Sequence, residues 1–294
     1  MDRFTVVSDA PMLLGESPVW RPADNALFWI DIAGQTVWQR RLADGREKHW
    51  RLPSEPGCIA LCRDGRLVVA MRSGIAFLDS VTGELSPVMA APYDVTTTRF
   101  NDGKCDAAGR FWLGTIYEPR DKPLAALYCL DKGTLTKTGN FGTVSNGLAF
   151  SPDSHTLYHA DTTSHVVRSY DFDLITGHLG NGRELMRFET QRGPSYGGRP
   201  DGAAVDSEGN YWCAMYEGAR IIKISPYGRL LDSIPVPVRC PTMVAFGGDD
   251  LQTLFITSVS QNRPKEELAA YPLSGHVFAT RVTVPGLPAA TYLP

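Results

Sequence analysis

An internal repeat constrains the fold of this chain more than any other sequence feature. Each unit has a small or polar residue, an apolar pair, a turn rich in Asp, Gly and Pro, and a strand of alternating apolar and aromatic residues. The units start about 40 to 45 residues apart, with one gap of about 55, which is typical of four-stranded propeller blades. The six starts are Gly15, Gly57, Asn101, Ser145, Pro200 and Pro241.

Hydrophobic alternation supports an all-β fold. Segments with period two recur in the units, such as TVWQRRL, GIAFLDS and RIIKISP, whereas a helical period is nearly absent. KEELAAY, which starts at Lys265, is the one helical turn that we expect. We therefore predict an all-β six-bladed β-propeller that forms a single domain over residues 1–294. FTVVSD near the N-terminus has no complete unit of its own, so we expect it to supply the outer strand of the last blade and close the ring.

Composition narrows the possible functions. The 28 Gly and 21 Pro fit the many turns that a propeller needs. The 29 basic and 32 acidic residues give a net charge of −3, and no basic run is present, so we expect no nucleic-acid partner. No apolar stretch or leader pattern predicts a membrane partner or secretion. With six cysteines in so long a chain, we expect free thiols and a cytoplasmic location.

Equivalent positions of the units predict a polar ring. The residue four places before the apolar residue that opens each turn should face the channel in every blade. Four of these six residues carry a carboxylate or amide oxygen, which suits Ca²⁺, Mg²⁺ or Mn²⁺ better than structural zinc. A turn cap is the simpler interpretation of any one of them, but their convergence favours a metal site. The six positions are Glu16, Gly57, Asn101, Asn146, Asp201 and Thr242.

Four segments carry a resemblance to a known family. GESPVW, RFNDGKCDAAGRFWLGT, SNGLAFSPD and PDGAAVDSEGNYW resemble the signature segments of the SMP-30/gluconolactonase/LRE family, also called the regucalcin family. The resemblance extends from about Gly15 to about Phe278. It implies a six-bladed propeller with one catalytic divalent cation near the channel mouth. It also implies metal-dependent hydrolysis of a sugar lactone, of the gluconolactone type, to the aldonic acid.

The same resemblance implies the metal ligands. It makes Glu16, Asn146 and Asp201 the protein ligands, all within the ring obtained by counting. Ca²⁺ is the ion that we expect, with Zn²⁺, Mn²⁺, Mg²⁺ and Fe²⁺ as alternatives. Asp201 is also the candidate catalytic base, and the attacking water would be bound to the cation or held beside it.

The substrate-binding residues are implied in the same way. Arg99 and Asn101 of the RFNDGK segment would line the pocket, where guanidinium and amide groups suit sugar hydroxyls and developing charge. Glu118, in the less distinctive stretch GTIYEP, would contact the substrate.

Alternative functions remain open from the sequence. One is a promiscuous esterase or organophosphate hydrolase of related propeller type, and another is a calcium-binding propeller without catalysis. The string Gly193–Gly197 matches the G-x-S-x-G nucleophile motif, but Pro194 and Gly198 favour a loop over the strand-to-helix turn that the motif requires. The identity of the sugar and the oligomeric state are not predicted.

Overall fold

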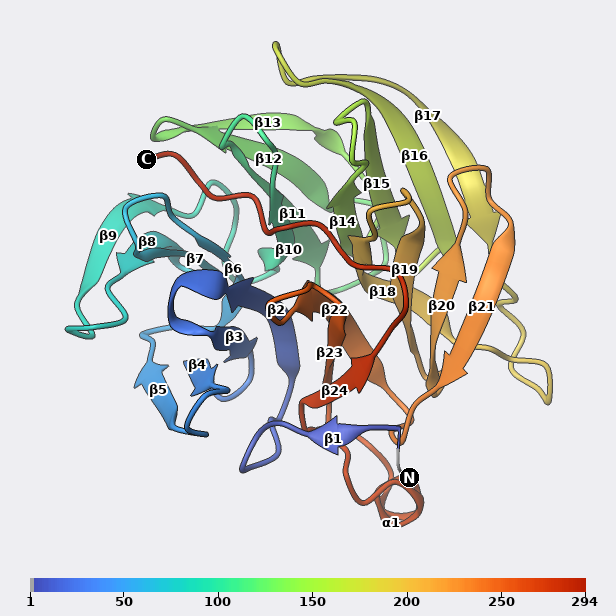
Figure 1. The fold of residues 1–294 in the computed structure, drawn as a ribbon. Coiled ribbons are helices and arrows are strands. Elements are labelled where there is room, and N and C mark those ends of the chain that lie inside the picture. Colours follow the sequence, from blue (N-terminus) through green and yellow to red (C-terminus); the bar gives the residue numbers. More distant parts are fainter. Residues whose placement is uncertain (1–2) are drawn as a thin grey trace.

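The computed structural model describes residues 3–294. Six four-stranded antiparallel sheets surround a central channel, with the first strand of each repeat unit innermost (Figure 1). This arrangement confirms the predicted six-bladed β-propeller.

The first three blades follow the chain in order. The first contains β2 (Gly15–Arg21), β3 (Ala26–Asp31), β4 (Thr36–Arg41) and β5 (Glu47–Arg51). The second contains β6 (Pro56–Leu61), β7 (Leu67–Met71), β8 (Gly74–Leu78) and β9 (Leu85–Ala90). The third contains β10 (Thr98–Cys105), β11 (Phe111–Tyr117), β12 (Ala126–Asp131) and β13 (Thr134–Asn140).

The last three blades complete the ring. The fourth contains β14 (Ser145–Phe150), β15 (Thr156–Asp161), β16 (Val166–Asp173) and β17 (His178–Arg187). The fifth contains β18 (Arg199–Val205), β19 (Tyr211–Tyr216), β20 (Arg220–Ile224) and β21 (Leu230–Pro235). The sixth contains β22 (Pro241–Gly247), β23 (Thr253–Ser258), β24 (Phe278–Arg281) and β1 (Thr5–Val6). Outside the sheets are the 3₁₀ turn η1 (Pro22–Asp24) and the helix α1 (Lys265–Ala270), where a helical turn was expected.

The sixth blade joins the two ends of the chain. Thr5 of β1 pairs with Ala279 and Val6 pairs with Phe278, so the N-terminal segment forms the outer strand of the last blade. This pairing confirms the predicted ring closure. It also covers the edge of β24, which would otherwise present unpaired backbone groups.

A β-bulge interrupts every inner strand near the start of the strand. Each of the six ring positions predicted from the sequence lies at or beside such a bulge. A bulge bends its strand and redirects the neighbouring side chain, which explains how a regular sheet can turn polar residues toward the channel. The register shifts lie between Glu16 and Val19, Pro56 and Cys58, Phe100 and Gly103, Asn146 and Ala149, Pro200 and Ala203, and Pro241 and Val244.

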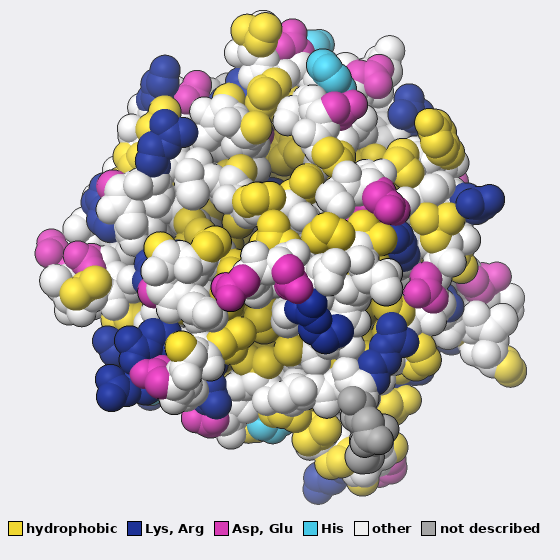
Figure 2. Space-filling view, in the orientation of Figure 1, with side chains coloured by type: hydrophobic (Ala, Val, Ile, Leu, Met, Phe, Trp, Pro, Cys, Tyr) yellow, Lys and Arg dark blue, Asp and Glu magenta, His cyan; other side chains and the backbone are white. Residues whose placement is uncertain are grey.

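The C-terminal tail, residues 283–294, crosses one end of the channel (Figure 1). The Gly286 N–H donates to the Leu251 carbonyl at 2.9 Å in the sixth blade. Further along, the Tyr292 N–H donates to the Leu61 carbonyl at 2.7 Å in the second blade. Figure 2 shows this end of the ring, where hydrophobic side chains gather around the centre. The tail therefore links the sixth blade to the second across this end of the channel.

Two further observations concern residues 3–294 as a whole. Every cysteine in this range is a free thiol, as expected. The range contains no helix with the length and apolar character that crossing a membrane requires.

Candidate active site

The two ends of the channel differ in chemistry. A cavity of about 500 Å³ lies where the inner strands end, and its walls are mainly apolar turn residues and tail residues 287–291. A smaller cavity of about 140 Å³ lies where the inner strands begin. Its polar lining residues are Glu16, Arg99, Asn101, Arg120, Asn146, Thr162, Thr163, Arg199, Asp201 and Tyr216. The smaller cavity therefore brings together all the predicted site residues except Glu118.

Two buried carboxylates face this cavity without a cationic partner. Within residues 3–294 the Asp201 carboxylate accepts no hydrogen bond, and neither it nor the Glu16 carboxylate forms an ion pair. Glu16 Oε2 accepts one bond, from the Ser17 N–H at 2.9 Å. Burial and the negative charge of Asp102 raise the pKa of Asp201 to about 8. Burial and the charge of Asp201 raise the pKa of Glu16 well above its ordinary value. Buried anions without compensation suit a bound cation.

Asn146 is oriented by a hydrogen-bond series that ends on a backbone carbonyl. Asn146 Nδ2 donates to Thr162 Oγ1 at 2.8 Å, and Thr162 Oγ1 donates to the Pro200 carbonyl at 2.7 Å. Because that carbonyl can only accept, the Thr162 hydroxyl must accept from Asn146. The NH₂ group of Asn146 therefore faces Thr162, and its oxygen faces the other way. The donor set of two carboxylates and one oriented amide oxygen fits a divalent cation that prefers oxygen ligands.

Arg99 and Asn101 continue this series on the other side. Arg99 Nη1 donates to Asn101 Oδ1 at 2.9 Å, and Asn101 Nδ2 donates to Asn146 Oδ1 at 2.8 Å. Asn101 Nδ2 also donates to the Ser145 carbonyl at 2.9 Å. Both Asn101 donors are thus used, and the lone pairs left on the two amide oxygens are available to a ligand.

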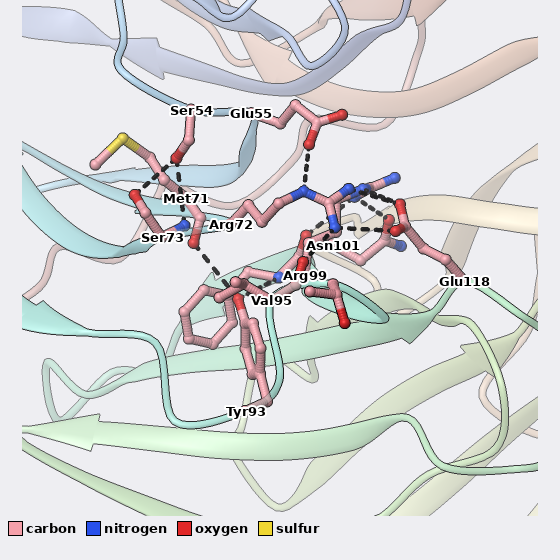
Figure 3. Close-up of polar contacts among 12 residues, drawn as sticks. Ser54, Glu55, Met71, Arg72, Ser73, Tyr93, Val95, Arg99, Asn101 and Glu118 are labelled. Atoms are coloured by element: carbon pink, nitrogen blue, oxygen red, sulfur yellow. Dashed lines mark hydrogen bonds and ion pairs between the residues drawn. The ribbon is translucent and has the colours of Figure 1, made fainter.

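Glu118 lies beside the cavity rather than in its wall. Its carboxylate accepts two bonds from Arg72, at 2.8 and 2.9 Å, and lies 3.5 Å from Arg99 Nε (Figure 3). Burial opposes the ionised form, but Arg72 and Arg99 hold the pKa of Glu118 below its ordinary value. Glu118 is therefore an ionised group that contacts the cavity residue Arg99 without lining the cavity itself.

Sequence reasoning missed four residues here: Arg72, Arg120, Thr162 and Arg199. Arg72 and Thr162 follow the second strands of their blades, outside the repeat positions that were compared. Arg199 stands two residues before Asp201, and this proximity is the one signal that could have identified it. The G-x-S-x-G string lies in the loop between β17 and β18, with neither the strand nor the helix that the nucleophile motif needs.

The fold and this cavity define a six-bladed propeller with a polar, oxygen-lined site at one mouth of its channel. Residues 14–260 match the family model described as SMP-30/Gluconolactonase/LRE-like region, and the chain belongs to this family. This finding confirms the resemblance seen in the sequence.

Individual relatives cover nearly the whole chain. A 6-deoxy-6-sulfogluconolactonase from Pseudomonas putida is 48% identical over 278 residues, which is 94% of each chain. Regucalcin from Gallus gallus is 32% identical and covers 94% of this chain and 93% of its own. A regucalcin from Agrobacterium tumefaciens, described as a calcium-binding protein, superposes with a TM-score of 0.92 at 27% identity, covering 98% of this chain and 96% of its own.

Proposed function

We propose that the chain is a divalent-metal-dependent lactonase that hydrolyses an aldono-1,4- or 1,5-lactone to the aldonic acid. The observation that carries this proposal is the pair of buried, uncompensated carboxylates, Glu16 and Asp201, beside an amide oxygen whose orientation is fixed. Membership of a gluconolactonase family supports the reaction type, as does the lactonase name of the P. putida relative.

Glu16, Asn146 and Asp201 would hold the cation. Three oxygen ligands of mixed charge favour Ca²⁺, and the calcium-binding relative from A. tumefaciens supports the same ion. Mg²⁺, Mn²⁺, Zn²⁺ and Fe²⁺ are the alternatives for a metal panel. When bound, the cation supplies Lewis-acid polarisation of the lactone carbonyl and stabilises the charge that develops on its oxygen.

The protein's own residues position the substrate and move the proton. Asp201 accepts a proton from the attacking water, whose oxygen forms the new bond to the carbonyl carbon. The bond between that carbon and the ring oxygen then breaks, and the proton goes to the released alkoxide. Arg99 lies in the same cavity and can donate from nitrogens not used in the bonds to Asn101 and Phe100. Asn101, whose N–H groups are both used, accepts from a sugar hydroxyl.

A panel of lactones crossed with a panel of metals tests the proposal. Purified protein, treated with chelator and reloaded with one ion at a time, is assayed on glucono-1,5-lactone, on 1,4-lactones and on the 6-sulfonated lactone that the P. putida relative's name suggests. We expect hydrolysis that chelator abolishes and the correct ion restores.

Two variants test whether activity depends on Asp201 itself or on the loss of any negative charge. Asp201→Asn should lower kcat/KM by about 10²- to 10⁴-fold, the usual contribution of a positioned base. Asp171→Asn removes an exposed carboxylate of β16, remote from the proposed site, and should leave kcat/KM unchanged. Failure of every lactone with every ion would refute the proposal. Hydrolysis of aryl esters or organophosphates alone would indicate the broader esterase, and cation binding without hydrolysis would indicate a structural ion.

A further inference from the structure

Three arginines line the cavity, and two of them donate no side-chain hydrogen bond within residues 3–294. Arg99 donates to Asn101 and to the Phe100 carbonyl. Within residues 3–294, the side chains of Arg120 and Arg199 donate no hydrogen bond. The Nε atom of Arg199 is fully buried and has no partner in that range. A guanidinium group offers five N–H donors, so leaving them unused at the partly buried Arg199 is costly unless a ligand takes them.

The contacts of Arg199 hold its guanidinium group in place without accepting hydrogen bonds from its N–H donors. Its guanidinium lies 5.1 Å from the centre of the Tyr216 ring, and Tyr216 faces the same cavity. Glu217 is 3.4 Å away, which is ion-pair distance but not a hydrogen bond, and its nearer partner is Arg192 at 2.8 Å. Arg199 is therefore rigid, and its N–H groups are free for another acceptor.

Arg120 approaches the cavity from the loop that follows β11. Its backbone has a φ of 57°, in the left-handed region that non-glycine residues seldom occupy. The Arg120 N–H donates to the Tyr117 carbonyl at 3.1 Å, which fixes this turn. The turn brings an otherwise exposed side chain to the cavity wall.

The donors that line the cavity exceed what a neutral substrate needs. Arg99 and Arg199 face Glu118 and Glu217 at 3.5 and 3.4 Å from beside the cavity, but neither contact is a hydrogen bond, and Arg120 has no anionic partner within residues 3–294. A divalent cation would add two more positive charges. A neutral sugar lactone offers only hydroxyl and carbonyl oxygens, whereas unpaired guanidinium groups bind anionic oxygens most strongly.

From these unused donors we infer that Arg199, assisted by Arg120, forms a subsite for an anionic substituent that the lactone carries away from its reacting carbonyl. The substituent is a sulfonate or a phosphate ester, because both present several oxygens to the planar donors of a guanidinium group. The inference rests on the proposed lactonase function and adds to it a substrate class and the residues that select this class.

Kinetics on matched lactones tests the subsite. Glucono-1,5-lactone, its 6-phosphate and its 6-deoxy-6-sulfonate differ only at the distal end, so their kcat/KM values isolate the effect of the substituent. For the wild-type protein we expect at least one anionic lactone to exceed the neutral one by about tenfold or more, the usual value of a charge-assisted hydrogen bond. The two anionic lactones distinguish sulfonate from phosphate.

Substitutions identify the residues. Arg199→Met should lower the ratio of kcat/KM for the preferred anionic lactone to kcat/KM for the neutral lactone by about tenfold or more. Arg199→Lys keeps the positive charge but lacks the planar donors, so its preference for the anionic lactone should lie between those of the wild-type protein and Arg199→Met. Arg120→Met should act in the same direction with a smaller effect. Arg183→Met, which removes an exposed charge from the outer strand β17, is the matched control and should affect no substrate.

Binding measurements keep the test independent of turnover. Calorimetric titration compares 6-phosphogluconate with gluconate, which share the carboxylate of the product and differ in the distal anion. If no lactone is hydrolysed, the proposed function fails, but tighter binding of 6-phosphogluconate that Arg199→Met abolishes would still support the subsite. Equal losses for neutral and anionic lactones in Arg199→Met, or no wild-type preference for either anion, would overturn the inference.

Discussion

Thr162 is predicted to control cation binding although it is not one of the proposed ligands. Its hydroxyl accepts from Asn146 at 2.8 Å and donates to the Pro200 carbonyl at 2.7 Å. Thr162→Val keeps the shape of the side chain but removes both bonds. It leaves an amide N–H and a carbonyl without partners in a buried place, and it releases the constraint that turns the Asn146 oxygen toward the cavity.

The magnitude follows from these two bonds. A buried polar group left without a partner costs about 1 to 3 kcal/mol, so we expect the free energy of unfolding to fall by about 3 kcal/mol. For a protein of 294 residues that loss corresponds to a melting temperature lower by roughly 5 °C. Loss of a residue that orients a metal ligand usually weakens metal binding by about 10- to 100-fold, and we expect a change in that range.

The assay is calorimetric titration of Ca²⁺ into chelator-treated protein, with melting curves in parallel. Thr162→Ser retains the hydroxyl and should restore both quantities. Thr115→Val is a matched control, because Thr115 is buried and bonds to both backbone groups of Ala126 but does not line the cavity. That variant should melt earlier yet bind Ca²⁺ normally. A Thr162→Val protein that binds Ca²⁺ with wild-type affinity would refute the argument that Thr162 orients Asn146.

Three other predictions concern the surroundings of the site and the fold. Arg72→Met removes the two bonds that hold Glu118 beside Arg99 and should raise KM for the lactone by about fivefold, the value of a partly exposed ion pair; an unchanged KM would remove Glu118 from substrate binding. Burial lowers the pKa of His159 to about 4, so the folded protein keeps this side chain neutral while the unfolded chain protonates it near pH 6.5. Stability from this group is complete above pH 6.5 and falls as the pH drops toward 4, by roughly 3 kcal/mol at about 1.4 kcal/mol per pH unit; urea unfolding at several pH values should show a shallower decline for His159→Gln. Truncation before Ser8 removes β1 and uncovers the edge of β24, so the shortened protein should melt earlier and associate in analytical ultracentrifugation; a stable monomer would show that β1 is dispensable.

The features that could be predicted from the sequence are those that recur from one repeat unit to the next. Spacing predicted the blade count, and the closing strand followed from the N-terminal segment that fits no unit. Counting back from the apolar anchors placed Glu16, Asn146 and Asp201 in one ring, and the structure brings them to one cavity. The bulges could not be predicted, because two residues opposing one is a property of the paired strands that the spacing of one strand does not encode.

Contacts between blades could not be predicted either, because they too depend on how separate segments are placed relative to one another. Thr162 matters because its hydroxyl meets the Pro200 carbonyl of the next blade, and Arg72 because it reaches Glu118 from the second blade to the third. The position directly after the second strand recurs in every blade, but its residue type changes from blade to blade and so carries no common signal. The roles of Thr162 and Arg72 depend on how neighbouring blades are spaced around the ring, which local patterns do not report.

The bonds that orient Asn146 also bear on the chemical ageing of the protein. Asn146 is followed by Gly147, where a Cβ atom would lie 2.1 Å from the Tyr211 hydroxyl, so no bulkier residue fits. In flexible peptides an asparagine before glycine loses its amide readily, because the unhindered next nitrogen attacks the side-chain carbonyl. Here both ends of the amide are held, by Asn101 and by Thr162, and the side chain is kept from rotating into that attack. We therefore expect slow deamidation at Asn146, so that no third carboxylate forms beside Glu16 and Asp201 during storage of the protein.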